Sequence, residues 1–337
     1  MAVLTPILKS SPVITRYAGN PVLSPKDIPY DASLVFNAGV AKYNGKYVMI
    51  FRDDMGFSEG HGMYEDFKGT HLGLATSDDG IKWDVAPTPF MTQEEMTTEE
   101  IRRFYDPRLT NIDGELYICF AVDTAHGILG GIGKIKEDLS GMDVLSMTAP
   151  DNRNMVLFPE KINGLYTRLE RPMPVYSRGR DRFDLWMSQS PDLKFWGNTQ
   201  IVLGVENVPY ANDKIGPAAP PVKTEKGWLT TFHAVDIDNT RGKNGWQPEW
   251  TKRYTAGIML LDLEDPSKIV GMSKEPLIAP EAPYEADEGF REQVIFPGAM
   301  LLEDSGEVKI YYGAADTVEC LATANVDDLI KLCTEKK

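Results

Sequence analysis

Residues 43–52, Tyr-Asn-Gly-Lys-Tyr-Val-Met-Ile-Phe-Arg, join a glycine-containing turn to a largely apolar run, and this pattern recurs four more times along the chain. The other copies begin at residues 112, 162, 224 and 304. Asn-Gly and Asp-Gly are strong signals for a β-hairpin, because the type I′ turn needs positive φ at both central residues. The five copies therefore predict five hairpins spread along the chain.

A second turn follows two of these hairpins. Residues 77–83 (Ser-Asp-Asp-Gly-Ile-Lys-Trp) and 190–196 (Ser-Pro-Asp-Leu-Lys-Phe-Trp) share the pattern Ser-x-Asp-x-x-x-Trp, and weaker relatives follow the other copies. Each unit then holds two hairpins, or one four-stranded sheet, and radial repetition of such sheets is a β-propeller. A β-sandwich with coincidental hairpins is the alternative. We predict an all-β fold, a five-bladed β-propeller forming one domain over residues 1–337, with short helices within 92–104 and at 327–333.

The composition limits the classes of function. The 337 residues include 50 acidic and 35 basic side chains, a net charge of −15. Nucleic acids and anionic membranes bind basic surfaces, so neither is expected as a partner. The spacing of Cys119, Cys320 and Cys333 argues against a disulfide framework and a zinc site. Residues 1–11 show no signal peptide and no run is long enough to span a membrane, so a cytoplasmic location is expected.

A propeller brings the ends of its inner strands to one axis, which is where we expect the active site. We take the repeat strands to be these inner strands. They end in the polar residues Arg52, Asp53, Asp54, Asp123, Arg171, His233, Asp236 and Asp316. Such residues suit a site at the mouth of the central channel, although exposed strand ends are polar in any protein.

The tetrapeptide Tyr105-Asp-Pro-Arg108 offers a candidate acid. Proline favours extended backbone at the residue before it, so we expect Asp106 to be extended, in a loop near the axis. Its carboxyl group could be a general acid or base. It could equally cap the loop as an Asx-turn.

Several cations come from segments near the predicted axis. They are Arg153, Arg171, Lys214 and His233. Arg matches phosphate oxygens in a bidentate way and Lys supplies a point charge, so together they would form an anion site. Alternatively each Arg pairs with a neighbouring acid, for example Arg171 with Glu170.

Two further patterns carry less weight. His61 and His71 lack a clear third ligand, so no metal is expected. The glycine-rich run 127–133 has no surrounding βαβ unit and is interpreted as a strand turn rather than a dinucleotide loop.

Taken together, these motifs resemble glycoside hydrolase family 130, the five-bladed propeller phosphorylases that act on β-mannosides. The resemblance spans nearly the whole chain and rests on the order and spacing of its motifs. They are Phe36-Asn-Ala-Gly39, Phe51-Arg52, Tyr105-Asp-Pro-Arg108, Asn152-Arg-Asn154, Leu157-Phe-Pro159, Glu170-Arg-Pro172, Lys214-Ile-Gly216, Phe232-His233 and Tyr311-Tyr-Gly-Ala-Ala-Asp316.

The resemblance implies a reversible, inverting phosphorolysis that yields α-mannose 1-phosphate. Asp106 would be the catalytic acid, acting through the 3-hydroxyl of the bound mannose. An inverting hydrolase needs a second carboxylate to activate water, whereas phosphate is already an anionic nucleophile and needs a cationic cradle. Inorganic phosphate is thus a co-substrate, and no cofactor is expected.

The resemblance also assigns residues to the two substrates. For phosphate they are Arg153, Arg171 and Lys214, with His233 and Tyr254 as neighbours. For the mannoside they are Asn37, Arg52, Tyr105 and Asp316, to which Asp53 is added from its strand position alone.

The substrate favoured by the sequence is β-1,2-linked mannobiose or short mannooligosaccharides. β-1,4-Mannooligosaccharides and β-1,4-mannosyl-N-acetylglucosamine follow closely. A β-mannosidase that uses water and a non-catalytic glycan-binding propeller are also compatible with these motifs. A homo-oligomer is compatible with this class of protein, and residues 92–104 and 238–253 are candidates for shaping the acceptor side.

Overall fold

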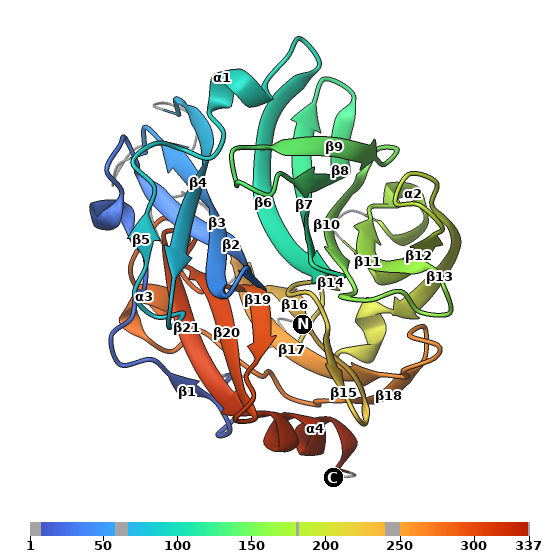
Figure 1. The fold of residues 1–337 in the computed structure, drawn as a ribbon. Coiled ribbons are helices and arrows are strands. Elements are labelled where there is room, and N and C mark those ends of the chain that lie inside the picture. Colours follow the sequence, from blue (N-terminus) through green and yellow to red (C-terminus); the bar gives the residue numbers. More distant parts are fainter. Residues whose placement is uncertain (1–7, 58–66, 180–181, 240–249, 336–337) are drawn as a thin grey trace.

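Five antiparallel sheets stand in a ring around a central axis (Figure 1). The structure is a computed structural model that describes residues 8–57, 67–179, 182–239 and 250–335. Four sheets have four strands each, and the fifth has five because its innermost strand is broken in two. The predicted all-β, five-bladed propeller is confirmed.

Blades 1 to 3 follow one another along the chain. Blade 1 contains β2 (Leu34–Tyr43), β3 (Lys46–Met55), β4 (Gly69–Ser77) and β5 (Asp84–Val85). Blade 2 contains β6 (Ile101–Ile112), β7 (Glu115–Thr124), β8 (Gly127–Ile135) and β9 (Met142–Met147). Blade 3 contains β10 (Asn152–Leu157), β11 (Tyr166–Pro172), β12 (Leu185–Ser190) and β13 (Gly197–Leu203).

Blades 4 and 5 complete the ring. Blade 4 contains β14 (Lys214–Pro217), β15 (Val222–Thr224), β16 (Gly227–Ile237), β17 (Lys252–Leu261) and β18 (Ile269–Met272). Blade 5 contains β19 (Ile295–Leu302), β20 (Glu307–Ala314), β21 (Val318–Asn325) and the N-terminal β1 (Thr15–Arg16). Because β1 pairs with β21, the two ends of the chain share one blade and close the ring.

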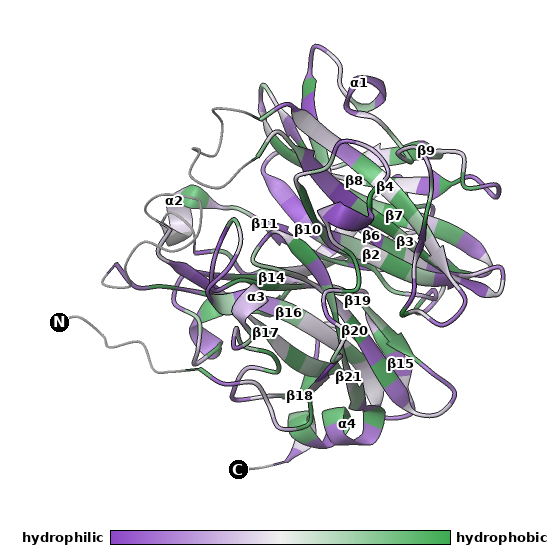
Figure 2. Ribbon diagram, turned by 90° about the vertical axis from the view of Figure 1, so that its left-hand side faces the viewer, coloured by the Kyte–Doolittle hydropathy of each residue, from purple (hydrophilic) through white to green (hydrophobic). Residues whose placement is uncertain are grey.

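The helices are short and lie outside the sheets (Figures 1 and 2). They are α1 (Gln93–Met96), α2 (Val175–Arg178), α3 (Pro283–Ala286), α4 (Val326–Thr334) and the 3₁₀ turns η1 (Pro25–Asp27) and η2 (Val205–Asn207). The helix expected within 92–104 is a single turn, since β6 begins at Ile101, and α4 lies at the predicted C-terminal position. Among the described helices, none has the length and apolar character of a membrane span.

The glycine turns lie where the sequence predicts hairpins, but the repeat strands are not the innermost ones. Each turn connects the innermost strand of a blade to its second strand, as Asn44-Gly45 connects β2 to β3. The strands that pack on one another around the axis are β2, β6, β10, β14 and β19. The assignment of the repeat strands to the channel is therefore wrong by one strand, because a turn signal marks a hairpin without saying which arm lies inside.

Four of the five innermost strands, β2, β6, β10 and β19, shift register, and in the first three the shift is a two-residue bulge. In β2, β6 and β10 the pairing register shifts, so that two residues oppose one on the next strand. The first residue of each bulge has positive φ: Asn37 (53°), Asp106 (54°) and Asn154 (59°). Asn and Asp adopt this conformation more readily than other non-glycine residues. A bulge re-aims a side chain and often lies beside an active site, so these three residues mark the functional end of the channel.

Candidate active site

A cavity of about 290 Å³ opens at one end of the axis, and all five blades contribute to it. Its lining consists of Asn37 and Arg52 from blade 1, Arg103, Tyr105, Asp106, Asp123 and Ile128 from blade 2, Arg153, Asn154 and Arg171 from blade 3, Tyr254 from blade 4, and Arg291, Val294, Phe296 and Asp316 from blade 5 or the segment before it. Eight of the eleven predicted site residues line this cavity. The prediction of a polar site at the central channel matches this placement.

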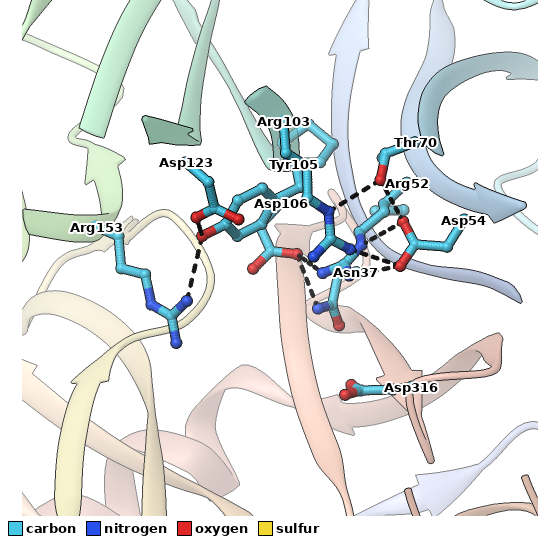
Figure 3. A network of polar contacts seen from close by, with 12 residues as sticks. Asn37, Arg52, Asp54, Thr70, Arg103, Tyr105, Asp106, Asp123, Arg153 and Asp316 are labelled. Atoms are coloured by element: carbon cyan, nitrogen blue, oxygen red, sulfur yellow. Dashed lines mark hydrogen bonds and ion pairs between the residues drawn. The ribbon is translucent and has the colours of Figure 1, made fainter. Parts of the chain in front are cut away.

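Asp106 projects from the bulge of β6 into this cavity (Figure 3). The backbone there is not extended, as the Asp-Pro sequence had suggested, but has a φ of +54° within the strand. The Asp106 Oδ1 atom accepts hydrogen bonds from Asn37 Nδ2 at 3.1 Å and from Arg52 Nη1 at 3.0 Å. Both hydrogen bonds go to the same carboxylate oxygen, and they come from side chains of blade 1 rather than from the backbone of an Asx-turn.

The charges around Asp106 favour its ionised form. Burial acts against ionisation, but the guanidinium groups of Arg52 and Arg108 and the hydrogen bond from Asn37 hold the pKa of Asp106 below its usual value. An acid in this setting is a carboxylate in the free protein at neutral pH. To act as an acid, this carboxylate must first take up a proton.

Arg52 is itself fixed by a second acid, Asp54. Arg52 donates to the two carboxylate oxygens of Asp54 at 3.0 and 2.6 Å, and Arg103 forms a further ion pair with Asp54 at 2.7 Å. Thr70 donates to Asp54 at 2.7 Å. The two arginines lower the pKa of Asp54 against the effect of burial, so this carboxylate remains charged and holds both arginines beside the cavity (Figure 3).

The predicted phosphate residues gather on the other side of Asp106. Arg153 Nη1 donates to the Tyr105 hydroxyl at 3.3 Å, and that hydroxyl donates to Asp123 at 2.7 Å. Lys214 lies over the Tyr254 ring, with its Nζ atom 5.8 Å from the centroid. Burial and the charge of Arg153 lower the pKa of Arg171 to about 9, and burial and the charge of Arg171 lower the pKa of Lys214.

Acids neutralise only part of this cluster. The Lys214 Nζ atom lies 3.8 Å from a carboxylate oxygen of Asp213. Within the described part of the chain, neither Arg153 nor Arg171 forms an ion pair with a carboxylate. Glu170, the neighbour that the sequence offered to Arg171, pairs instead with Arg168 at 2.8 Å. Repulsion among buried cations is relieved by an anion, so the cluster is suited to a phosphate group.

His233 lies behind this cluster and not in the cavity. It is fully buried in β16, and burial together with Arg171 lowers the pKa of its imidazole, so the ring is neutral. Its Nε2 atom lies 2.8 Å from Arg171 Nη1 and its Nδ1 atom lies 3.1 Å from the Pro217 carbonyl oxygen. Because an arginine can only donate, Nε2 accepts and the proton is on Nδ1. In this arrangement His233 orients Arg171.

Asp53 also lies outside the cavity. Side chains alternate along a strand, so Asp53 points to the opposite face of β3 from Arg52 and Asp54. It is fully buried, and among the described residues neither of its carboxylate oxygens has a hydrogen-bond partner. Its prediction as a sugar contact came from strand position alone and does not fit this placement.

The sequence missed three polar lining residues: Arg103, Asn154 and Arg291. Arg103 shares a strand face with Tyr105, and Asn154 is the bulge counterpart of Asp106, so alternation and repeat alignment could have identified them. Arg291 pairs with Asp316 at 2.8 Å across 25 residues of sequence, which left no local signal. His61 and residues 240–249 of the candidate acceptor loop lie outside the described residues.

Fold and cavity together define a class, a propeller with a bulged aspartate beside a cluster of cations on its axis. A family model described as beta-1,4-mannooligosaccharide phosphorylase matches residues 10–335. The chain is 32% identical to the 1,2-beta-oligomannan phosphorylase of Thermoanaerobacter sp. (strain X514), over 94% of this chain and 98% of that protein. It is also 32% identical to the beta-1,4-mannooligosaccharide phosphorylase of Ruminococcus albus, over 94% and 90%.

A solved structure agrees with these comparisons. The β-1,2-mannobiose phosphorylase of Listeria innocua, in complex with β-1,2-mannobiose, superposes with a TM-score of 0.79 at 25% identity, covering 95% of this chain and 99% of that one. The chain belongs to glycoside hydrolase family 130 and is an enzyme of that family. The family predicted from the sequence is confirmed.

Proposed function

We propose that this enzyme cleaves β-mannosides with inorganic phosphate and inverts the anomeric centre to give α-mannose 1-phosphate. The observation that carries the proposal is the buried cluster of Arg153, Arg171 and Lys214 in and beside the cavity that contains Asp106. The names of the relatives, all phosphorylases of mannosides, support it.

In this mechanism Asp106 is the general acid, with its proton passing through a hydroxyl of the bound mannose. A phosphate oxygen bonds to the anomeric carbon while the bond from that carbon to the glycosidic oxygen breaks. The departing oxygen takes the proton that originates on Asp106, and the proton released by the esterified phosphate restores the acid. Arg153, Arg171, Lys214 and Tyr254 would hold phosphate in line, and Asn37, Arg52 and Asp316 would hold the mannose.

Bound phosphate would also change the charge state of Asp106. Arginines lower the pKa of this carboxyl group in the free enzyme. Arg153 is one of the cations that lower it, after Arg52 and Arg108, so an anion bound at Arg153 would offset part of this effect and raise the pKa of Asp106. The acid would thus become protonated in the complex that uses it. Inorganic phosphate is a co-substrate here, and the described residues include no cluster of three or more potential ligands that suits a metal.

For the linkage we favour β-1,2, in mannobiose or short mannooligosaccharides. The relatives named for β-1,2 substrates include two from Thermoanaerobacter at 32% identity and the Listeria enzyme, whose fold superposes well. β-1,4-Mannooligosaccharides are the second candidate, because the relative from Ruminococcus is equally similar.

The reverse reaction tests the activity and the linkage together. The enzyme is mixed with α-mannose 1-phosphate and mannose, glucose or N-acetylglucosamine, and phosphate release and product linkage are measured. We expect phosphate release and a β-1,2-linked product with mannose as acceptor. Mannose liberated from β-mannosides without phosphate, and no reverse reaction with any acceptor, would instead identify a hydrolase.

Two variants separate the chemical roles. Asp106→Asn should lower kcat by about a hundredfold or more in either direction, because it removes the acid. Arg171→Ala should abolish phosphorolysis but leave any hydrolysis intact. A hydrolase would therefore be recognised by an Arg171→Ala variant that retains its full activity.

A further inference from the structure

The peptide group between Asn37 and Ala38 is held at both ends by buried ionisable side chains that do not line the cavity. Its carbonyl oxygen accepts from Arg108 Nη1 at 3.1 Å, and its N–H donates to Glu319 Oε2 at 3.1 Å. This peptide lies in the bulge of β2, where the register shift removes it from regular pairing with β3. Arg108 and Glu319 therefore replace the hydrogen bonds that the bulge gives up.

Arg108 links several blades at this point. It belongs to β6, is 3% exposed, and also donates to the carbonyl oxygens of Pro107 at 2.7 Å and Ala218 at 2.9 Å. Its guanidinium carbon lies 5.1 Å from the centroid of the Phe296 ring. One side chain thus joins the bulge of blade 1, the bulge of blade 2 and the inner segment of blade 4.

Glu319 reaches the same peptide from blade 5. It lies in β21 and is fully buried, and its other carboxylate oxygen has no partner among the described residues. Burial raises the pKa of this carboxyl group to about 8, against the opposing effects of Ala38 and Arg108. A buried acid with a single hydrogen bond is costly to the fold, and a benefit elsewhere would offset that cost.

That benefit is the geometry of Asn37. Its positive φ and its fixed peptide group direct its side chain to Asp106, to which it donates a hydrogen bond. We infer that Arg108 and Glu319 are positioning residues, which lock the two bulges from behind so that Asn37 and Asp106 meet at the acid's working geometry. This inference rests on the proposed role of Asp106 as the general acid.

The test compares four single variants in the phosphorolysis of β-1,2-mannobiose, or of β-1,4-mannobiose if the wild type prefers it. Arg108→Lys keeps the charge but not the fork of donors, and Glu319→Met keeps the length but not the acceptor. Glu319→Gln keeps a carbonyl acceptor for Ala38. The control Arg168→Lys removes an equally buried fork in blade 3, which bonds to Glu170 and Ser188 and does not line the cavity.

We expect Arg108→Lys and Glu319→Met to lower kcat by about tenfold to a hundredfold, because a small displacement of the catalytic acid slows the reaction strongly. The KM for phosphate should stay within about twofold of the wild-type value, since the phosphate cations are untouched. Glu319→Gln should recover kcat to within about threefold of wild type, and the control should retain the wild-type kcat. A kcat within twofold of wild type for both Arg108→Lys and Glu319→Met would overturn the inference.

A double-mutant cycle shows whether Arg108 acts through Asn37. In an Asn37→Ala background the hydrogen bond to Asp106 is already absent, so adding Arg108→Lys should cost no more than about threefold in kcat. Fully multiplicative effects would overturn the inference. If Arg108→Lys does not fold, two experiments on Glu319 test the inference instead. One compares the kcat of Glu319→Met with that of Glu319→Gln, and the other repeats the double-mutant cycle with Glu319→Met in place of Arg108→Lys. Absence of phosphorolysis in the wild type would count against the proposed function itself.

Discussion

His233 shows how a single residue can serve a site without touching the ligand. Its neutral ring accepts a hydrogen bond from Arg171 and donates one to the Pro217 carbonyl, so the guanidinium group has one preferred position. A role as a direct phosphate ligand, expected from the sequence, does not fit a side chain that is fully buried.

Replacing His233 should therefore weaken phosphate binding indirectly. His233→Phe removes the acceptor while retaining a ring of similar size, so Arg171 loses its orientation. We expect the KM for phosphate to rise by about tenfold, because about this much affinity is lost with one charge-assisted hydrogen bond. The kcat at saturating phosphate should change less. Initial rates as a function of phosphate concentration measure this. An unchanged KM for phosphate would contradict the orienting role.

Asp53 leads to a prediction about stability and pH. Burial, with the nearby charges of Asp54 and Asp31, raises the pKa of Asp53 from 3.8 to about 8. The folded state then binds more protons than the unfolded state between about pH 4 and pH 8, so this group makes the protein less stable as pH rises through that window.

Asp53→Asn should remove this pH dependence. We expect its free energy of unfolding to exceed that of the wild type by about 2 kcal/mol at pH 8 and the difference to shrink towards pH 4. Thermal unfolding measured at several pH values is the test, with Asp143→Asn on an exposed strand as a control that should behave like the wild type. A pH-independent difference would show that Asp53 is ionised equally in both states.

These residues also show what could be predicted from sequence. Asp106, Arg153 and Arg171 were identifiable because each belongs to a short motif in a fixed order. Asp53 was misplaced because it adjoins Arg52, and neighbours in a strand face opposite sides. Arg291 was missed because its partner Asp316 lies on another segment of the chain.

At the scale of the element, the bulges aim Asn37 and Asp106 into the site, and the turn signals in the sequence do not predict where these bulges lie. Turn residues fixed the positions of the five hairpins, since Asn-Gly and Asp-Gly act locally. The inner strand and the bulged residue depend on packing between blades. The backbone at Asp106 illustrates this, since its left-handed conformation opposes the preference that a following proline imposes.

Close packing at the bulge of β2 requires a glycine on the neighbouring blade. A Cβ atom at Gly298 of β19 would lie 1.9 Å from the carbonyl oxygen of Ala38. Gly298→Ala should therefore push blades 1 and 5 apart and lower the free energy of unfolding by about 2 kcal/mol or more. Thermal unfolding measures the effect. The matched control is Gly197→Ala, whose Cβ atom would meet nothing within 4 Å and which should stay within about 0.5 kcal/mol of wild type. Equal stability of the two variants would mean that the ring accommodates the added atom.

At the scale of the molecule, ring closure depends on a short N-terminal strand that has no hairpin signal. β1 consists of Thr15 and Arg16, which pair with Thr323 and Ala322. Arg16 also donates to the carboxylate oxygens of Glu285 at 2.7 and 2.9 Å and to the Ala279 carbonyl oxygen at 2.7 Å. Glu285 is a fully buried residue of α3 and also accepts from the Tyr312 hydroxyl of β20, so this pair ties the first strand to α3 and through it to the last blade.

Breaking this pair should cost stability without changing the chemistry. Arg16→Met leaves the Glu285 carboxylate buried with its cation removed, although Tyr312 still donates to it at 2.8 Å. We expect the free energy of unfolding to fall by about 3–5 kcal/mol, as for other buried pairs that lose one partner. The control is Lys46→Met, whose partner Asp78 is exposed and whose loss should cost less than about 1 kcal/mol.

Thermal unfolding and phosphorolysis at 25 °C should be measured on the same samples. A lower melting temperature with an unchanged kcat and KM would show that closure of the ring and the axial site are energetically separate. A matching loss of activity at 25 °C would show that the strain of an open ring reaches the bulges around Asp106.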